Sequence, residues 1–547
     1  MRTRKVTKVL VLLLCTMLVI SVFAGCSGKD SDTSGSSKND STATSEPTKS
    51  VDSNFNKTGY PIVKEPITLK FMVSKAPAHG DFAEMEYFKA MEELTNIKID
   101  FISVDSGSWE EKKNLALASG DLPDLFFTGM SIKDETMYGI EGKTLIPIGN
   151  LINDYAPNIK KVFAEYPDSK SAVTAMDGNI YTLPYIADTL TVAHSTLYVR
   201  GDWIDQTVGK SPETLDEFYA MVKAFKGLGA DKIPISPNNF DTFKLYMINA
   251  FGELIDNLYD RDSNDKVVFV PATDQYKEMI KFINTLFTEK LLDNEVFTQK
   301  AEQANAKVTE GKAGCMTYGT LLLPSHYASG KNETELLKPL TSQWNNTPHI
   351  HGRYPTSIGM AAFTNVNKHP EATMRWLDIN YSDEDVAPGI HSLTLWLGVR
   401  DKHWEYKNPE KTTYGRLMPA DSKIAEIEWS NRYITPGWGP CKLVFKAVPE
   451  NNPGQEMKAK ESVKNWFPYA VLPFPNQYMR YTSEEQSRLN TAQNDVETLV
   501  KQMEAKFVIG QESLDKWDEY INNLKKAGLE DLIKIKQDAY DRYKANK

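Results

Sequence analysis

Cysteine is scarce in this chain, with four residues among 547. Cys15 and Cys26 fall in the N-terminal segment, so only Cys315 and Cys441 remain for the rest of the chain. Two cysteines cannot form the disulfide framework that stabilises small secreted domains. A bond between Cys315 and Cys441 is compatible with an oxidising compartment. We favour two buried free thiols, because unpaired cysteine is among the most buried residue types.

Clusters of positive charge are absent beyond the N-terminus. The chain has 63 Lys and Arg against 73 Asp and Glu, a formal net charge of −10. The first 25 residues carry four positive charges and no acidic one, so removing them takes this net charge from −10 to about −14. Nucleic acids are bound through basic patches that neutralise their phosphates. We therefore expect no nucleic acid partner.

The motifs of common enzymes and metal sites are also missing. There is no Gly-x-Ser-x-Gly, no His-Glu-x-x-His and no glycine-rich phosphate loop. His349 and His351 are two residues apart, but no further His or Cys follows at the spacing of metal ligands. Residues 260–265, DRDSND, are similar to the start of a calcium loop, yet the glycine at position six and the glutamate at position twelve are lacking. We predict a hairpin turn there, no metal, no cofactor and no enzymatic activity.

One class of enzyme stays open, because its catalytic groups leave no local motif. Glycoside hydrolysis uses two carboxylates that are close in space and need not be close in sequence. An exported carbohydrate-degrading enzyme is therefore an alternative, and it would be recognised by turnover of its substrate.

The one long apolar run lies at residues 9–23 and follows four basic residues. About 15 residues are too few for a transmembrane helix, which needs ~20. The pattern is typical of a secretory signal peptide, and an uncleaved N-terminal anchor is the alternative. Residues 23–26, FAGC, resemble a bacterial lipobox, in which Cys26 is lipidated and becomes the N-terminus. We predict a lipoprotein signal peptide at 1–25 and an extracytoplasmic protein anchored to the cell membrane through Cys26.

The segment after Cys26 is polar. Residues 27–57 consist almost entirely of Ser, Thr, Asp, Lys, Gly and Asn. Such a segment cannot bury enough apolar surface to offset the entropy lost on ordering. We predict that residues 26–57 are a lipidated flexible linker.

The body, from residue 58, has about 490 residues, which is too many for one ordinary core and indicates two lobes. Apolar residues alternate at 67–73, a helix is expected after Asp81, and a second strand at 97–101. Ser108 and Glu111 predict a capping box for a helix that ends at Gly120. A buried strand follows at 124–128. This strand–helix alternation predicts an α/β fold with a parallel sheet.

Later segments continue the alternation and then become helical. Thr214 with Glu217 predicts the start of a helix that ends at Gly227, and Pro370 predicts another helix start. Three apolar stripes at helical spacing follow after residue 488. The chain therefore ends in extra C-terminal helices.

Five segments, in this order, resemble the bacterial extracellular solute-binding proteins of ABC importers, in the carbohydrate-binding family that includes maltose-binding protein. They are LASGDLPDL at 117–125, MDGNIYTLP at 176–184, YVRGDWI at 198–204, TLDEF at 214–218 and EGKAG at 310–314. Together with the lipobox and the polar linker, they make the chain similar to the longer lipoprotein branch of that family.

The resemblance implies a two-lobed periplasmic-binding-protein-like fold with a ligand cleft between the lobes. We expect the N-lobe to comprise 58–186 plus 356–440, and the C-lobe 187–355 plus 441–547. It implies a monomer that captures a carbohydrate, expected to be an oligosaccharide, by hinge closure, and delivers it to the transmembrane subunits of an ABC permease. A peptide or other non-sugar solute is the alternative ligand.

Sugars have apolar ring faces rimmed with hydroxyl groups, so candidate contacts are aromatic or polar residues near strand ends and lobe crossings. Asp81 follows the first strand, where the family often has a polar contact, but it also fits a helix N-cap. Asp188 lies at the first expected crossing, where the family often has an acidic contact. Tyr185 beside it would stack on ligand or pack the hinge.

Further candidates are aromatic residues outside regular elements. Trp438 is flanked by Pro and Gly, which predicts either an exposed platform or a cover over the core. Trp344, Arg353 and Tyr354 belong to a polar cluster near the second expected crossing. Many family members have a Trp after the segment that corresponds to 310–314, and Tyr318 is its expected substitute here. His79 and Trp109 are weaker candidates.

Overall fold

The computed structural model describes residues 53–189, 197–317, 335–450 and 452–545. The residues from Ser53 to the C-terminus form one compact unit. The predicted signal peptide, Cys26 and most of the predicted linker lie outside the described residues. None of the helices in the described ranges has the length and apolar character needed to cross a membrane.

The body begins a few residues earlier than predicted, since residues 53–57 are part of it. The Asn54 side chain donates to the Glu65 carbonyl (3.0 Å), and Phe55 forms a β-bridge with Val63. The Phe55 ring packs edge-on against Tyr155, with ring centroids 5.5 Å apart. Phe55 thus packs residues 53–57 against the folded body.

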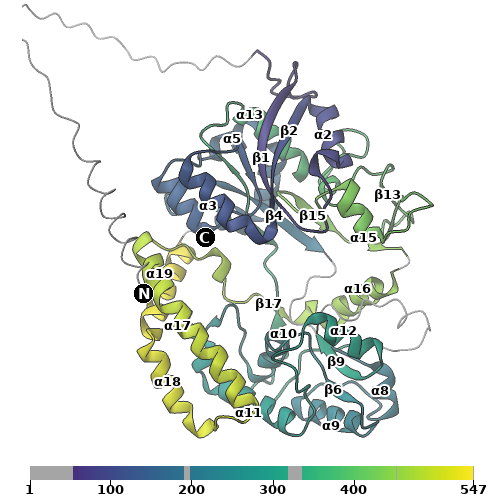
Figure 1. The fold of residues 1–547 in the computed structure, drawn as a ribbon, viewed down its shortest axis with the longest axis vertical. Helices are drawn as coiled ribbons and strands as arrows, with labels where there is room; N and C mark the ends of the chain where they lie inside the picture. The colour runs from purple at the N-terminus through teal and green to yellow at the C-terminus, as the bar shows by residue number, and fades with distance from the viewer. Residues whose placement is uncertain (1–52, 190–196, 318–334, 451, 546–547) are drawn as a thin grey trace, which may run out of the picture. The chain divides into compact units, whose positions relative to one another are not determined.

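The first lobe is built on a six-stranded sheet with the order β15-β4-β12-β3-β1-β2 (Figure 1). Its strands are β1 (Ile67–Lys75), β2 (Ile97–Asp105), β3 (Leu125–Phe127), β4 (Thr182–Thr189), β12 (Thr356–Phe363) and β15 (Lys442–Phe445). β12 is antiparallel to its neighbours and the other five strands run parallel. The carboxyl ends of these five strands therefore meet at one edge, here called the carboxyl edge, where β12 begins.

Helices cover both faces of this sheet because side chains alternate along its strands. Phe71 of β1 belongs to a core that includes residues of α2, α5, α6 and α13. Its neighbour Met72 belongs to a smaller core with Trp109 and Leu117 of α3. The covering helices are α2 (Glu86–Thr95), α3 (Trp109–Ser119), α5 (Gly149–Tyr155), α6 (Pro157–Glu165), α7 (Pro167–Val173) and α13 (Pro370–Asp378) (Figure 1).

Most of the predicted helix boundaries are confirmed. The Thr214 hydroxyl accepts from the Glu217 amide at the start of α9 (Leu215–Lys226), and Gly120, with φ of 81°, ends α3. Asp81 caps a short 3-10 turn that precedes α2. The predicted capping box at Ser108 is wrong. A 3-10 turn precedes α3 and leaves Ser108 with φ of −111° and ψ of 6°, so its side chain makes no capping hydrogen bond.

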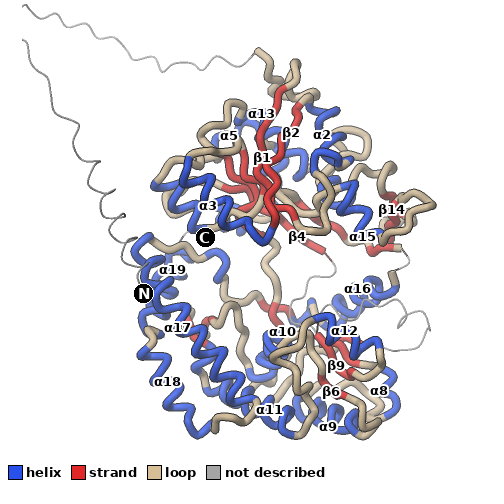
Figure 2. Tube along the Cα trace, in the orientation of Figure 1, coloured by secondary structure: helices blue, strands red, loops and turns tan. Residues whose placement is uncertain are grey.

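The second lobe is built on a four-stranded sheet with the order β10-β5-β9-β6. Its strands are β5 (Leu197–Val199), β6 (Ile233–Ile235), β9 (Ala313–Thr317) and β10 (Glu335–Leu336). The helices of this lobe are α8 (Gly201–Gln206), α9 (Leu215–Lys226), α10 (Phe240–Met247), α11 (Asp274–Thr288) and α12 (Ala301–Thr309). The predicted C-terminal helices are confirmed as α17 (Ser483–Val508), α18 (Trp517–Lys526) and α19 (Leu529–Ala545) (Figure 2). Their apolar side chains belong to the core of this lobe.

Four further α-helices and seven further strands lie in the described residues. The helices are α4 (Ile132–Asp134), α14 (Thr394–Leu397), α15 (Glu426–Trp429) and α16 (Pro453–Asn465). The strands are β7 (Tyr259–Arg261), β8 (Val267–Phe269), β11 (Ile350–His351), β13 (Trp404–Tyr406), β14 (Thr413–Arg416), β16 (Val448–Pro449) and β17 (Ala470–Val471).

The first sheet includes residues beyond 186 and 440, where the two segments of the N-lobe were expected to end. β4 continues to Thr189, and β15 extends the first sheet to Phe445. The added residues pair in register, Ile186 with Lys442 and Thr189 with Phe445. Pairing with β4 therefore holds these residues in the first lobe.

The two buried free thiols and the hairpin turn that the sequence predicts are confirmed. Cys315 and Cys441 are free and buried. Cys315 lies in β9 of the second sheet, and Cys441 directly precedes β15 of the first sheet. Residues 260–265 lie in and after β7, which pairs with β8 as an antiparallel hairpin. Asp262 accepts hydrogen bonds from backbone amides there, and Asp265 pairs with Lys544 (2.6 Å). Among the described residues, no group of three or more His, Cys, Asp and Glu is placed to hold a metal ion.

Candidate ligand-binding site

Three neighbouring pockets follow the carboxyl edge of the first sheet. The aromatic pocket, about 400 Å³, lies at the ends of β1 and β3 and is lined by Trp109 and Trp438. The central pocket, about 890 Å³, and the outer pocket, about 410 Å³, lie at the end of β4. Trp438 lines both the aromatic and the central pocket. Ala187, Thr189 and Arg353 line both the central and the outer pocket, so the three form a continuous row.

Trp109 is fixed at the wall of the aromatic pocket by a glycine. Its indole Nε1 donates to the Gly129 carbonyl at 3.0 Å. Gly129 has φ of 77°, and a Cβ at this position would lie 2.2 Å from Trp109 Nε1. Only glycine allows both this backbone conformation and this close approach. The indole is 6% exposed and borders the pocket with one side.

Trp438 is an exposed aromatic platform. Its side chain is 41% exposed, and its ring lies 4.7 Å from that of Tyr185, which is 3% exposed. Gly437 and Gly439, with φ of 65° and 157°, form the turn on which it stands. A Cβ on Gly439 would lie 2.8 Å from the Phe127 ring, so the loop can pack closely on the sheet only with glycine there.

The loop after β1 holds the Trp438 loop in place. The Ala76 amide donates to His79 Nδ1 (3.2 Å), and the Pro436 carbonyl accepts a hydrogen bond from the same imidazole. The Gly80 amide donates to the Asn431 carbonyl at 3.1 Å. Burial, together with the nearby Lys75 charge, lowers the pKa of His79. The neutral imidazole therefore bridges two loops of the aromatic pocket.

The central pocket is lined from both lobes. Tyr185 and Arg353 come from the first-sheet side, whereas Gln455 and Lys458 come from α16. The C-terminal end of α16 is attached to the second lobe, because the Asn465 side chain donates to the Leu336 carbonyl of β10 at 3.0 Å. A ligand in this pocket would therefore contact both lobes.

Charged groups in the outer and central pockets differ in their pairing. Asp188 and Lys446 form an ion pair beside the outer pocket, in which each side chain is about half exposed. The Arg353 guanidinium lines both pockets and has no ion-pair or hydrogen-bond partner within the described ranges. A guanidinium carries five donors in a fixed planar arrangement. Arg353 is therefore available to a ligand.

Comparison with known proteins assigns this architecture to a family. The family model described as bacterial extracellular solute-binding protein matches residues 77–386, which is more than half of the chain. The chain belongs to this family. The two α/β lobes with pockets at the carboxyl edge are thus those of a solute-binding protein, in which ligands bind beyond the carboxyl ends of strands.

Two curated relatives and one solved structure illustrate the similarity. The chain is 28% identical to the fructooligosaccharide ABC transporter substrate-binding protein FusA of Streptococcus pneumoniae over 522 residues, or 89% of this chain and 92% of FusA. It is 22% identical to the polygalacturonan/rhamnogalacturonan-binding protein YtcQ of Bacillus subtilis over 83% of this chain and 88% of YtcQ. The structure of FusA in complex with kestose superposes with a TM-score of 0.69 at 26% identity, covering 88% of this chain and 100% of that one.

Four of the predicted ligand contacts lie in the row of pockets. Tyr185, Arg353 and Trp438 line the central pocket, and Asp188 lines the outer pocket. Burial raises the pKa of the Tyr185 phenol, and Tyr185 backs the Trp438 ring as part of the core. Both weaker candidates, His79 and Trp109, line the aromatic pocket.

The other predicted contacts are placed elsewhere. Asp81 is exposed and accepts from the Ala83 amide (3.1 Å), which is the N-cap role that the sequence left open. Trp344 lines a separate pocket of about 380 Å³ with Phe251 and Phe282 of the second lobe. Tyr354 donates to the Pro473 carbonyl and packs against Tyr478. Tyr318 lies outside the described residues.

Sequence reasoning missed several residues of the central pocket. Arg416 of β14, Glu426 of α15 and Lys458 of α16 line it, although they lie 228–270 positions beyond Asp188 in the chain. Their segments carry no motif and no hydrophobic pattern that points to a binding site. The pairing of β14 with β16, which follows β15 in the chain, brings Arg416 near β4.

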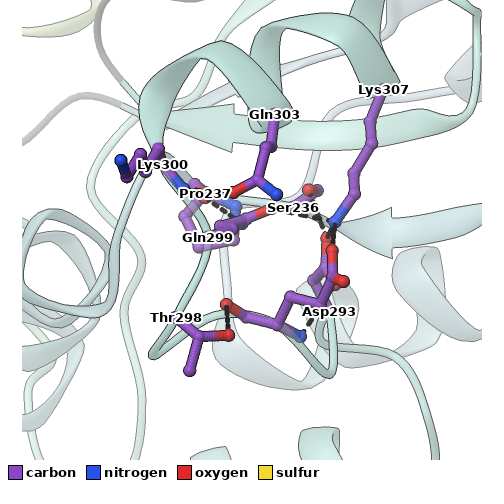
Figure 3. A network of polar contacts seen from close by, with 9 residues as sticks. Ser236, Pro237, Asp293, Thr298, Gln299, Lys300, Gln303 and Lys307 are labelled. Carbon is purple, nitrogen blue, oxygen red and sulfur yellow. Dashed lines mark hydrogen bonds and ion pairs between the residues drawn. The ribbon is translucent and has the colours of Figure 1, made fainter.

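A network of polar contacts lies at the carboxyl end of β6 in the second sheet. The Lys307 ammonium contacts Asp293, Glu295 and Gln299 at 2.6–2.9 Å, as Figure 3 shows for Asp293. Asp293 also accepts from the Ser236 hydroxyl (2.6 Å), directly after β6. The network joins the loop after β6 to residues 293–299 and to Lys307 of α12.

Proposed function

We propose that this protein is the substrate-binding component of an ABC importer, that it captures an oligosaccharide by hinge closure, and that it delivers the sugar to a membrane permease. The observation that carries the proposal is the row of three pockets at the carboxyl edge of the first sheet, in a chain of the solute-binding family. The carbohydrate names of FusA and YtcQ support the ligand class.

The pocket chemistry supports a sugar. Trp109, Trp438 and Tyr414 present aromatic rings, against which the apolar face of a sugar ring can pack. Thr128, Gln455 and other polar side chains supply donors and acceptors for hydroxyl groups. Together the pockets extend along five strand ends, which suits several sugar rings in a row.

Capture requires no covalent step. In a hinge-closure mechanism the ligand contacts both lobes, and its binding free energy favours the closed form. Tyr185, Arg353 and Trp438 would contact the ligand from the first lobe, and Gln455 and Lys458 from α16. We infer two lobes that hinge around the segments before β12 and after β15. A binding protein of this kind returns its ligand chemically unchanged.

We further propose that the mature chain is a monomer held at the outer face of the cell membrane by a lipid on Cys26. The FAGC sequence at 23–26 and the polar segment that follows support this anchor. Cys26→Ala should release the protein into the medium, whereas the wild type should stay with the membrane fraction and gain the mass of a lipid. Membrane retention of Cys26→Ala would favour the uncleaved anchor instead.

A thermal-shift screen tests the ligand class. Residues 27–547 are mixed with mono- and oligosaccharides and, in parallel, with di- and oligopeptides. A ligand at a hundredfold its Kd adds about 2.7 kcal/mol to the stability. An oligosaccharide that raises Tm and is recovered unchanged supports the proposal. A peptide that raises Tm in place of sugars would contradict the ligand class, and a sugar consumed during the assay would indicate a carbohydrate-degrading enzyme.

A further inference from the structure

The central pocket is rich in positive charge, although the chain as a whole is acidic. Three cationic side chains line it, Arg353, Arg416 and Lys458. Among the described lining residues, the one carboxylate is that of Glu426, which pairs with Arg416 (Nε–Oε1 3.3 Å). Because the formal net charge of the whole chain is −10, this local excess of cations is opposite to the average surface.

These cations are held in partly desolvated positions. Lys458 is 3% exposed, and the Arg416 side chain is 6% exposed. Burial lowers the pKa of the Lys458 ammonium to about 8 and also lowers the pKa of the Arg416 guanidinium. Partial desolvation strengthens the attraction between these cations and an anionic ligand in the pocket.

Arg353 is the side chain best placed to bind an anionic group directly. It lines the central and the outer pocket, and no hydrogen bond or ion pair within the described chain occupies its guanidinium. Arginine binds a carboxylate through two parallel N–H···O bonds, which gives both affinity and orientation. Trp438 lines the same central pocket, so a sugar ring on the indole would lie near these cations.

From this geometry we propose that the ligand is an acidic oligosaccharide, with carboxylates such as those of uronic acids, and that Arg353 binds one of these carboxylates. The inference rests on the proposed function, since it assumes that a carbohydrate occupies the pockets. It narrows the substrate class from oligosaccharides in general to those that carry carboxylates.

Matched pairs of ligands test the inference. Oligosaccharides of galacturonate, glucuronate, mannuronate and guluronate are each compared with their carboxyl-reduced forms, which differ only by a hydroxymethyl group in place of the carboxylate. Neutral and sulfated oligosaccharides complete the panel. By calorimetric titration, we expect the tightest ligand to be a uronate that binds at least tenfold more tightly than its reduced form. Its affinity should decrease as salt increases.

The other outcomes separate the two proposals. If a neutral, sulfated or carboxyl-reduced oligosaccharide is the tightest ligand, the inference of an acidic ligand is overturned and the carbohydrate function stands. If no carbohydrate of any kind binds, the proposed function itself is contradicted.

Variants of Arg353 locate the effect. Arg353→Gln should weaken binding of the tightest uronate tenfold or more, and binding of its reduced form less than threefold. Arg353→Lys should keep part of the preference for the acid, because it keeps the charge. Lys501→Gln, which removes one positive charge from the exposed face of α17, should change neither affinity. Equal losses for both ligands with Arg353→Gln, in a protein of unchanged Tm, would overturn the role of Arg353.

Discussion

At the scale of single residues, exposure alone does not distinguish a ligand platform from a surface aromatic. Trp344 and Trp438 are 40% and 41% exposed, and both lie outside regular helices and strands. Trp438 stands on two glycines above the carboxyl edge and lines two pockets of the row. Trp344 lines a pocket on the second lobe. What distinguishes the two rings is their surroundings, which are formed by segments distant in the sequence.

Trp438 gives the first prediction. Trp438→Ala should weaken binding of the oligosaccharide by about 1–3 kcal/mol, or roughly 5- to 150-fold, because it removes a central aromatic contact. The stability should change by about 1 kcal/mol or less, since the side chain is 41% exposed. Calorimetric titration and thermal unfolding measure the two effects.

Tyr433 offers a matched control for this prediction. It is 51% exposed in the same stretch of chain and lines none of the four pockets described above. Tyr433→Ala should therefore leave the affinity unchanged. Equal affinities of Trp438→Ala and wild type would show that the sugar does not use this platform.

His391 gives a prediction about pH. Burial lowers the pKa of His391 to about 4, and its Nε2 has no hydrogen-bond partner within the described residues. In the unfolded chain its pKa is about 6.5. Because the unfolded state binds the proton more tightly, stability is full above about pH 6.5 and is lost as the pH falls towards 4. Between pH 7.5 and pH 5, this one group should cost about 2 kcal/mol.

The variant His391→Gln isolates this contribution. Gln has no proton to gain, so the difference in stability between variant and wild type should move by about 2 kcal/mol in favour of the variant from pH 7.5 to pH 5. Thermal unfolding of both proteins at the two pH values measures it. A difference that is the same at both pH values would mean that folding does not lower the pKa of His391.

At the scale of elements, periodicity predicts what local sequence determines. The first three strands and the helix capped by Thr214 were predicted, because alternation and capping are local signals. Asp81 caps the turn that it was predicted to cap. Ser108 makes no capping hydrogen bond, because it belongs to a 3-10 turn that precedes α3. The wall of the central pocket was missed, because β14, α15 and α16 approach β4 only through long-range pairing.

The attachment of the C-terminal helices depends on a buried ion pair. Lys244 of α10 and Glu504 of α17 lie 2.7 Å apart, and their side chains are 6% and 4% exposed. Lys244→Met should destabilise the protein by about 3–5 kcal/mol, because it leaves the Glu504 carboxylate buried with no cation from α10. Lys244→Met combined with Glu504→Leu should recover most of this loss. Thermal unfolding measures both variants.

A second ion pair that involves α17, but is exposed, is the control. Arg488 of α17 pairs with Asp531 of α19, and both side chains are well exposed. Arg488→Met should cost less than about 1 kcal/mol. If the double variant is as unstable as Lys244→Met alone, the loss comes from packing rather than from the unpaired charge.

At the scale of the whole molecule, the sequence predicted the fold class and the family, because five motifs occur in the family's order. Four of the eight predicted ligand contacts, Tyr185, Asp188, Arg353 and Trp438, line the row of pockets. The two cores and the pocket lined from both lobes favour a protein that closes on its ligand. Saturation with the oligosaccharide should therefore reduce the radius of gyration measured by X-ray scattering. An unchanged radius at saturation would contradict hinge closure.

The most direct test of the central claim is a crystal structure of residues 27–547 with the tightest oligosaccharide from the binding screens. We predict an intact sugar along the carboxyl edge of the first sheet, with one ring on Trp438 and contacts to both Arg353 and α16. An oligosaccharide bound only at the Trp344 pocket, or a cleaved sugar in the pockets at the carboxyl edge, would contradict it.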